Sequence, residues 1–142
     1  MFATVAPRKN PGAFNAGAYR QVGLETGVDA ASPHQLVLML IDGYQDALVQ
    51  ARGAIAARDI EAKGRAIGRA VRIIEEGLRA GLNTEAGGSL ADRLDALYSY
   101  ITVRLTQANS ANDIAALEEC SRLMDPVRSA WVAIEGQAGT HG

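Results

Sequence analysis

The sequence has little of several residue types, and each shortage excludes a class of protein. It has one cysteine, which excludes a disulfide framework and a cysteine-rich metal site. The formal net charge is only -2, so the chain lacks the basic footprint of a nucleic-acid-binding protein. Aromatic residues make up 5%, and no proline lies between Pro33 and Pro126. Together with abundant alanine, these shortages favour helix over sheet.

Long apolar runs are also missing. The longest, Leu36 to Ile41, is far shorter than the about 20 residues that cross a bilayer. The first residues, Met1 to Ala6, are too few and too mixed for the apolar core of a signal peptide. We therefore expect a cytosolic protein with no membrane insertion, where Cys120 stays a reduced thiol.

The length of 142 residues suits one domain. Residues 1–15 contain prolines and no periodicity, which predicts a mobile N-terminal tail. Residues 16–135 are predicted to form a single helical domain that begins with a short helix over 16–22. Residues 136–142 are predicted to be a frayed C-terminal tail.

Four longer helices are predicted from local signals and apolar stripes. Ser32 is a good N-cap with Pro33 at the first helical position, and Asp59 can cap the second helix. Gly81 is placed to end that helix in a left-handed conformation. A loop is expected over 83–88, with Gly87 and Gly88 as its hinge, and a turn over 109–112, where Ser110 or Asn112 can cap the last helix. The stripes are Leu36, Leu40, Tyr44, Leu48, Ala51, Ile55; Ile60, Gly64, Ile67, Val71, Ile74, Leu78; Leu90, Leu94, Leu97, Ile101, Leu105, Ala108; and Ile114, Leu117, Cys120, Met124, Val127, Trp131, Ile134.

Short loops between amphipathic helices of similar length force neighbours to run antiparallel. The predicted fold is therefore all-α, an antiparallel up-down-up-down four-helix bundle with a short N-terminal helix and a mobile N-terminal tail. Pro126 conflicts with the last helix, because a proline inside a helix removes a hydrogen bond. Since the stripe continues beyond it, we expect a kink near Leu123 and no helix end.

The placement of histidine and cysteine in the sequence does not predict catalytic chemistry. The only histidines, His34 and His141, have no glutamate three residues before them, which excludes the di-metal site that bundles can hold. Cys120 lies in an apolar stripe with no histidine placed to activate it, so a core role is expected. His34, in a first helical turn, fits a capping or surface role better than phosphotransfer. We expect no catalytic residue, cofactor or metal.

More apolar residues are present than one stripe per helix requires. The additional ones are Val37, Leu38, Met39, Ile41, Ile73, Tyr100 and Val103. Surplus apolar faces indicate a wide core, an oligomer, or grooves that receive a partner helix. The glycines Gly64, Gly68 and Gly77 leave shallow places on the second helix, which indicates tight helix packing or close approach of another chain.

Several stretches together resemble the flagellin export chaperones of bacteria. They are Ala31-Ser32-Pro33-His34-Gln35-Leu36-Val37-Leu38-Met39-Leu40, Asp59-Ile60-Glu61-Ala62-Lys63-Gly64, Leu97-Tyr98-Ser99-Tyr100-Ile101 with Arg104-Leu105 and Ala108-Asn109, Asn112-Asp113, Leu117-Glu118-Glu119 and Trp131. The resemblance runs from about Ala18 to Trp131. Two departures are Ile41-Asp42-Gly43, where the family usually has a tyrosine before the polar residue, and Pro126.

The resemblance implies a cytoplasmic chaperone that binds the disordered C-terminal segment of flagellin, prevents premature polymerisation and helps deliver it to the flagellar export gate. It leaves contact with assembly regulators open. It also implies an N-terminal tyrosine that docks near the binding surface, and Tyr19 is the matching position. We place partner binding on the second and third helices; the candidates are Tyr19, Ile67, Val71, Ile74, Leu78, Tyr98, Ile101 and Leu105. The alternative is a structural bundle that forms a homodimer or larger homo-oligomer through its surplus stripes.

Overall fold

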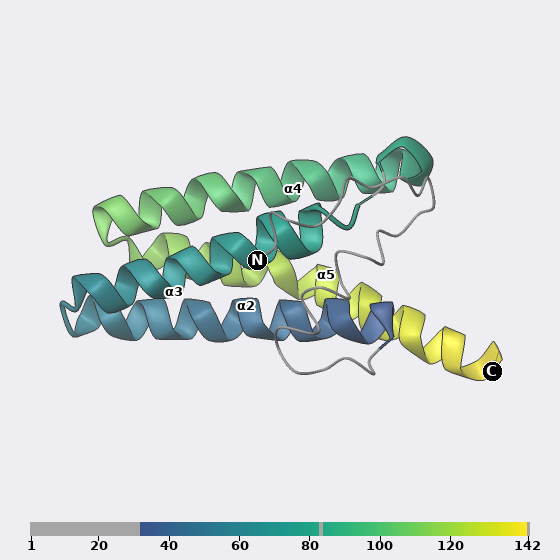
Figure 1. The fold of residues 1–142 in the computed structure, drawn as a ribbon, viewed down its shortest axis with the longest axis horizontal. Helices are drawn as coiled ribbons and strands as arrows, with labels where there is room; N and C mark the ends of the chain where they lie inside the picture. Colours follow the sequence, from purple (N-terminus) through teal and green to yellow (C-terminus); the bar gives the residue numbers. More distant parts are fainter. Residues whose placement is uncertain (1–31, 83, 142) are drawn as a thin grey trace.

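The computed structural model describes residues 32–82 and 84–141. Its elements are α2 (Pro33–Ala56), α3 (Ile60–Arg72), η2 (Ile73–Arg79), α4 (Thr84–Ala111) and α5 (Ile114–His141). Over this part of the chain the prediction of an all-α four-helix bundle is confirmed, and Figure 1 shows consecutive long helices running in alternating directions. The predicted N-terminal tail, the short helix over 16–22 and Tyr19 lie outside the described residues.

The first two helices begin where the sequence predicts. The Ser32 hydroxyl accepts a hydrogen bond from the Gln35 backbone N–H at 3.1 Å, and the Gln35 side chain accepts one from the Ser32 N–H at 3.1 Å. This reciprocal pair is a capping box, and Pro33 follows at the first helical position. The Asp59 carboxylate accepts from the Ala62 N–H at 3.0 Å and caps α3. Arg58, in the tight turn between the two helices, has a φ of 58°.

Four local predictions are wrong. The second helix does not stay α-helical to its end, because residues 73–79 form the π-helix η2. Its end has no left-handed glycine, since Gly88 is the only described glycine with positive φ. Gly88 has φ 64° and ψ -144°, which confirms the predicted hinge, but the chain is already helical from Thr84 in place of the expected loop. The residue that caps α5 is Asp113, in place of the expected Ser110 or Asn112. Its carboxylate accepts a hydrogen bond from the Ala116 N–H at 3.1 Å.

α5 continues through Pro126 and runs to His141, beyond the predicted frayed end at residue 136. Pro126 cannot donate to the carbonyl of Arg122, but both residues are exposed, so water can hydrate that carbonyl. The expectation that Pro126 does not end the helix is therefore confirmed, and the kink near Leu123 stays a prediction.

The core lies along the axis between the four helices. Its largest fully buried side chains are Tyr44, Tyr98, Ile41, Leu48, Ile74, Leu78, Ile101, Leu105, Leu117, Met124, Val37 and Cys120. Of the surplus apolar residues, Val37 and Ile41 thus belong to this core, whereas Met39, Tyr100 and Val103 are exposed. The additional apolar residues therefore both widen the core and add apolar surface.

The predicted shallow places on the second helix divide into two kinds. A Cβ built on Gly77 would lie 3.0 Å from Cδ1 of Leu40, so Gly77 allows η2 to pack closely on α2. A Cβ on Gly64 or Gly68 would meet nothing within 4 Å. Gly77 therefore serves helix packing, while the other two glycines leave open space.

Candidate functional site

The structure places most of the predicted partner-binding residues in the core. Six side chains are at most 2% exposed: Ile67, Ile74, Leu78, Tyr98, Ile101 and Leu105. Val71 is half-buried against the same core. These six side chains have almost no solvent-exposed surface through which a partner could contact them. Their direct contact with a partner stays a prediction.

The apolar stripe of α5 is buried near the start of the helix and becomes exposed towards its end. Cys120 and Met124 are fully buried, and Val127 is buried as well. One turn later Trp131 is only half-buried, and Ile134 is 49% exposed. Since these residues follow the helical spacing of one face, the face that packs in the core emerges uncovered towards the end of α5.

The stripe of α4 does the same in the opposite chain direction. Ile101 and Tyr98 are buried, whereas Leu97 and Leu94 are half-buried and Leu90 is 64% exposed. The leucine stripe of α4 is therefore less covered towards the beginning of that helix, although Ala91 there is buried.

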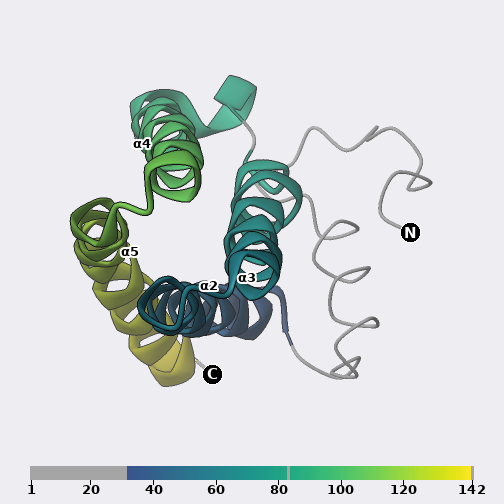
Figure 2. The ribbon, with the colours of Figure 1, turned by 90° about the vertical axis from the view of Figure 1, so that its left-hand side faces the viewer.

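The two uncovered faces lie at one end of the molecule, because α4 and α5 are antiparallel. Figure 1 shows α4 and α5 diverging towards this end, where α4 begins, and Figure 2 shows α5 leaving α4 to run beside α2. We call these two apolar stretches together the open end; its members are Leu90, Leu94 and Leu97 on α4, and Trp131 and Ile134 on α5. An exposed apolar stretch on a helix is a suitable contact for the apolar face of another helix.

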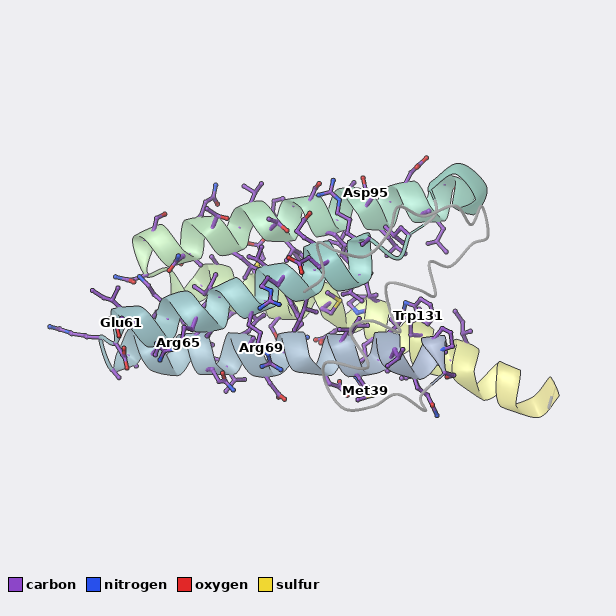
Figure 3. The ribbon with its side chains drawn as sticks, viewed as in Figure 1. Met39, Glu61, Arg65, Arg69, Asp95 and Trp131 are labelled. Atoms are coloured by element: carbon purple, nitrogen blue, oxygen red, sulfur yellow. The ribbon has the colours of Figure 1, made fainter. Side chains whose placement is uncertain are left out.

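Trp131 is held in place from α2. The His34 Nε2 lies 2.5 Å from the Trp131 backbone oxygen, and the two ring centroids are 5.0 Å apart with their planes tilted by 52°. His34 is half-buried, so the expected surface or capping role is wrong: this side chain joins the start of α2 to α5. Figure 3 shows Trp131 where α5 passes the start of α2.

Polar contacts hold the helices together beside the open end. The Arg79 Nε donates to Asp95 at 2.6 Å and its Nη1 donates to Glu75, which also accepts from the Thr102 hydroxyl at 2.8 Å. These bonds join η2 to α4. On the other side of α4, Glu119 accepts from Tyr100 and Arg104, and these two hydrogen bonds lower the pKa of the Glu119 carboxyl. The helices that carry the open end are thereby fixed to their neighbours.

The buried polar side chains Tyr44 and Cys120 lie next to each other in the core. The Tyr44 hydroxyl donates to the Cys120 backbone oxygen at 2.8 Å, and burial strongly raises the pKa of Tyr44. Burial also raises the pKa of the Cys120 thiol to about 11, so the thiol stays protonated at neutral pH and is a poor nucleophile. The expectation that Cys120 is a core residue is confirmed.

Over the described ranges, no three histidine, cysteine or carboxylate side chains gather as they would around a metal ion. None of the helices in that same part of the chain is long and apolar enough to span a membrane.

Sequence reasoning included the members of the open end in its stripes and read them as core. Leu94, Leu97 and Trp131 do pack against the core in part, whereas Leu90 and Ile134, at the outer ends of the two stripes, are exposed.

The matching family model and the similar proteins all point to one family. The model of the family described as "Flagellar protein FliS" matches residues 15–138. The flagellar secretion chaperone FliS of Salmonella typhimurium is 47% identical over 121 residues, 85% of this chain and 90% of that protein. Flagellar secretion chaperone FliSB of Pseudomonas aeruginosa is 46% identical over 116 residues, 82% and 91% of the two chains. The FliS of Bacillus subtilis is 35% identical over 114 residues, 80% of each.

Proposed function

Since this chain belongs to the FliS family of flagellar secretion chaperones, we propose that it binds the C-terminal segment of flagellin at the open end of its bundle. The observation that carries the site is the emergence of two core stripes, those of α4 and α5, at the same end. The proposal places the protein in the cytosol, without catalytic activity, as a carrier that keeps flagellin unpolymerised until it reaches the export gate.

The physical basis is burial of apolar surface. A wrapped flagellin segment would bury one apolar stretch of its own on Leu90 and Leu94 of α4 and another on Trp131 of α5. The same stretches of the segment are then hidden from other flagellin molecules. Ordering a disordered segment has an entropic cost, so a large wrapped area gives modest affinity, and competition at the export machinery can release the cargo.

The predicted core residues then have an indirect part. Ile74, Leu78 and Ile101 set the spacing of α4 from its neighbours, and through it the shape of the open end. Val71, half-buried on α3, and Tyr19 remain candidates for direct contact. For Tyr19, replacement by alanine should weaken flagellin binding without lowering thermal stability, and unchanged affinity would exclude a docking role.

The test compares flagellin with flagellin that lacks its C-terminal segment. Co-purification should recover the full-length protein and lose the truncated one, and equal recovery of both would overturn the proposal. The site is tested with Leu90→Asp, which introduces a charge at a position 64% exposed and therefore spares the core. Full burial of a leucine contributes about 1.5–3 kcal/mol, so the Kd should rise roughly tenfold to a hundredfold.

Val49→Asp is the matched control, because Val49 is 63% exposed on α2, away from the open end. This variant should bind flagellin as the original chain does. Equal affinities of the two variants would exclude the open end as the flagellin site while leaving binding itself intact.

A second candidate, a homo-oligomeric structural bundle, is favoured by the exposure of Tyr100 and Val103 on α4. It predicts a dimer or larger particle by light scattering at micromolar concentration. It also predicts that Val103→Asp returns the chain to a monomer. A monomer before and after that substitution excludes this candidate.

A further inference from the structure

Two arginines on one face of α3 have no ion-pair partner among the described residues. Arg65 and Arg69 are exposed and four residues apart, so their side chains leave the same face of the helix. Ion pairs within the described residues engage Arg52, Arg72, Arg79, Arg104 and Arg128, whereas Arg58, Arg93 and Arg122, like Arg65 and Arg69, form none there. Among these same residues no carboxylate lies within 4.0 Å of Arg65 or Arg69.

Apolar surface borders these charges. Met39 on α2 is 39% exposed, and Ile73 at the start of η2 is half-buried. A Cβ built on Gly43 would lie 3.2 Å from Nη2 of Arg69 and 3.5 Å from Cδ1 of Ile73. Both side chains therefore approach α2 at a glycine, where α2 has no side chain of its own. We call Met39, Gly43, Arg65, Arg69 and Ile73 the α2–α3 face.

Two carboxylates lie near this face without neutralising it. Glu61 precedes Arg65 by one helical turn, and Asp46 follows Gly43 by three residues on α2. Both are exposed, and neither forms an ion pair with Arg65 or Arg69. The arginine side chains are thus available to carboxylates brought by another molecule.

We propose that the α2–α3 face docks an acidic amphipathic helix of a second protein. Carboxylates on that helix would pair with Arg65 and Arg69 in charge-assisted hydrogen bonds, and an adjacent apolar stripe would cover Met39 and Ile73. Exposed ion pairs add little affinity, so the charges act mainly on association rate and partner choice, and the apolar contacts hold the helix.

The charged part of this face is separate from the open end. Figure 3 shows Arg65 and Arg69 on α3, displaced along the bundle from Trp131, whereas Met39 lies nearer to Trp131. The proposal does not depend on what the open end binds.

The test uses a fluorescein-labelled synthetic helical peptide with glutamates at positions i and i+4 beside leucines at i+1 and i+5. A scrambled peptide of the same composition has the same charge without the two faces. Binding to the full chain is measured by anisotropy at low and physiological salt. Arg65→Glu/Arg69→Glu is compared with Arg93→Glu/Arg122→Glu, which reverses two exposed arginines outside the ion pairs named above, on α4 and α5.

The amphipathic peptide should bind the original chain and the Arg93/Arg122 variant alike, and the scrambled peptide should bind at least tenfold more weakly. Reversal at Arg65 and Arg69 should slow association by about tenfold or more at low salt, with a smaller effect at physiological salt. Circular dichroism confirms that both variants stay helical. Equal effects of the two double variants, equal binding of the two peptides, or no binding of the amphipathic peptide would each overturn the proposal.

Discussion

Replacing Lys63 by methionine tests how α3 is joined to α4. Lys63 is 8% exposed and is the one charged residue in the described core. Its Nζ donates to the Asn109 backbone oxygen at 2.7 Å and to the Asn112 Oδ1 at 2.6 Å, at the end of α4. Asn112 itself has a φ of 53°, a conformation few residues adopt, so the lysine stabilises both a helix C-terminus and a strained turn.

The expected cost follows from these two bonds. A hydrogen bond to a charged group contributes about 1.5–3 kcal/mol net when buried. Asn109 is half-buried and Asn112 is exposed, so water can hydrate both acceptors once the ammonium is gone. Methionine keeps the apolar stem in place. We therefore expect Lys63→Met to lower the free energy of unfolding by about 1.5–3 kcal/mol in total, below the sum of two fully buried bonds.

A double-mutant cycle separates the energy of the hydrogen bond between Lys63 and Asn112 from the effect of the substitutions on the backbone. Asn112→Gly removes the Oδ1 acceptor and retains the positive φ without strain. Urea denaturation followed by circular dichroism gives the unfolding free energy of the two single variants and the double variant. A coupling energy of about 1 kcal/mol between the substitutions is predicted. Additive effects within about 0.3–0.5 kcal/mol would refute the account, because independent sites add to that precision.

Three further predictions concern stability and are measured by urea denaturation. Tyr44→Phe loses the buried bond to the Cys120 carbonyl and should cost about 1 kcal/mol; no change would mean the bond contributes nothing. Gly77→Ala should lower the free energy of unfolding by about 1–3 kcal/mol, because the added methyl group meets Leu40. Gly64→Ala adds a methyl group that meets nothing and should raise the free energy of unfolding by about 0.5–1 kcal/mol. Changes of the same sign in the two variants would contradict the packing described. Burial raises the pKa of Tyr98 to about 12 against about 10 in the unfolded chain, so the contribution of Tyr98 to stability is full below about pH 10 and is lost as the pH rises towards 12. Over this range stability should fall less steeply in Tyr98→Phe, and the same slope in both chains would exclude Tyr98 as a cause.

Local signals in the sequence predict the starts of α2 and α3, but not those of α4 and α5. Ser32 and Asp59 cap their helices through bonds to residues three positions on, which depend on nothing distant. Gly81 and η2 show the limit of such signals. The π-helix over 73–79 forms where Gly77 packs against Leu40, a contact between helices that no local pattern encodes.

The candidate site illustrates the same limit at a larger scale. A seven-residue repeat identifies the face of a helix that packs, so it selected Ile74, Ile101 and Leu105, which are core. The repeat cannot tell where a neighbouring helix stops covering that face. Leu90 and Ile134 lie beyond that point, which becomes visible only when the lengths and directions of all four helices are known.

The open end contains a natural reporter of its own occupancy, because Trp131 is the only tryptophan in the chain. The most direct measurement is the emission of Trp131 during titration with a tryptophan-free peptide of the flagellin C-terminal segment. Binding at the open end predicts a blue shift and protection from a soluble quencher, both lost in Leu90→Asp and retained in Val49→Asp. Binding detected by calorimetry without any change in Trp131 emission would contradict the central claim.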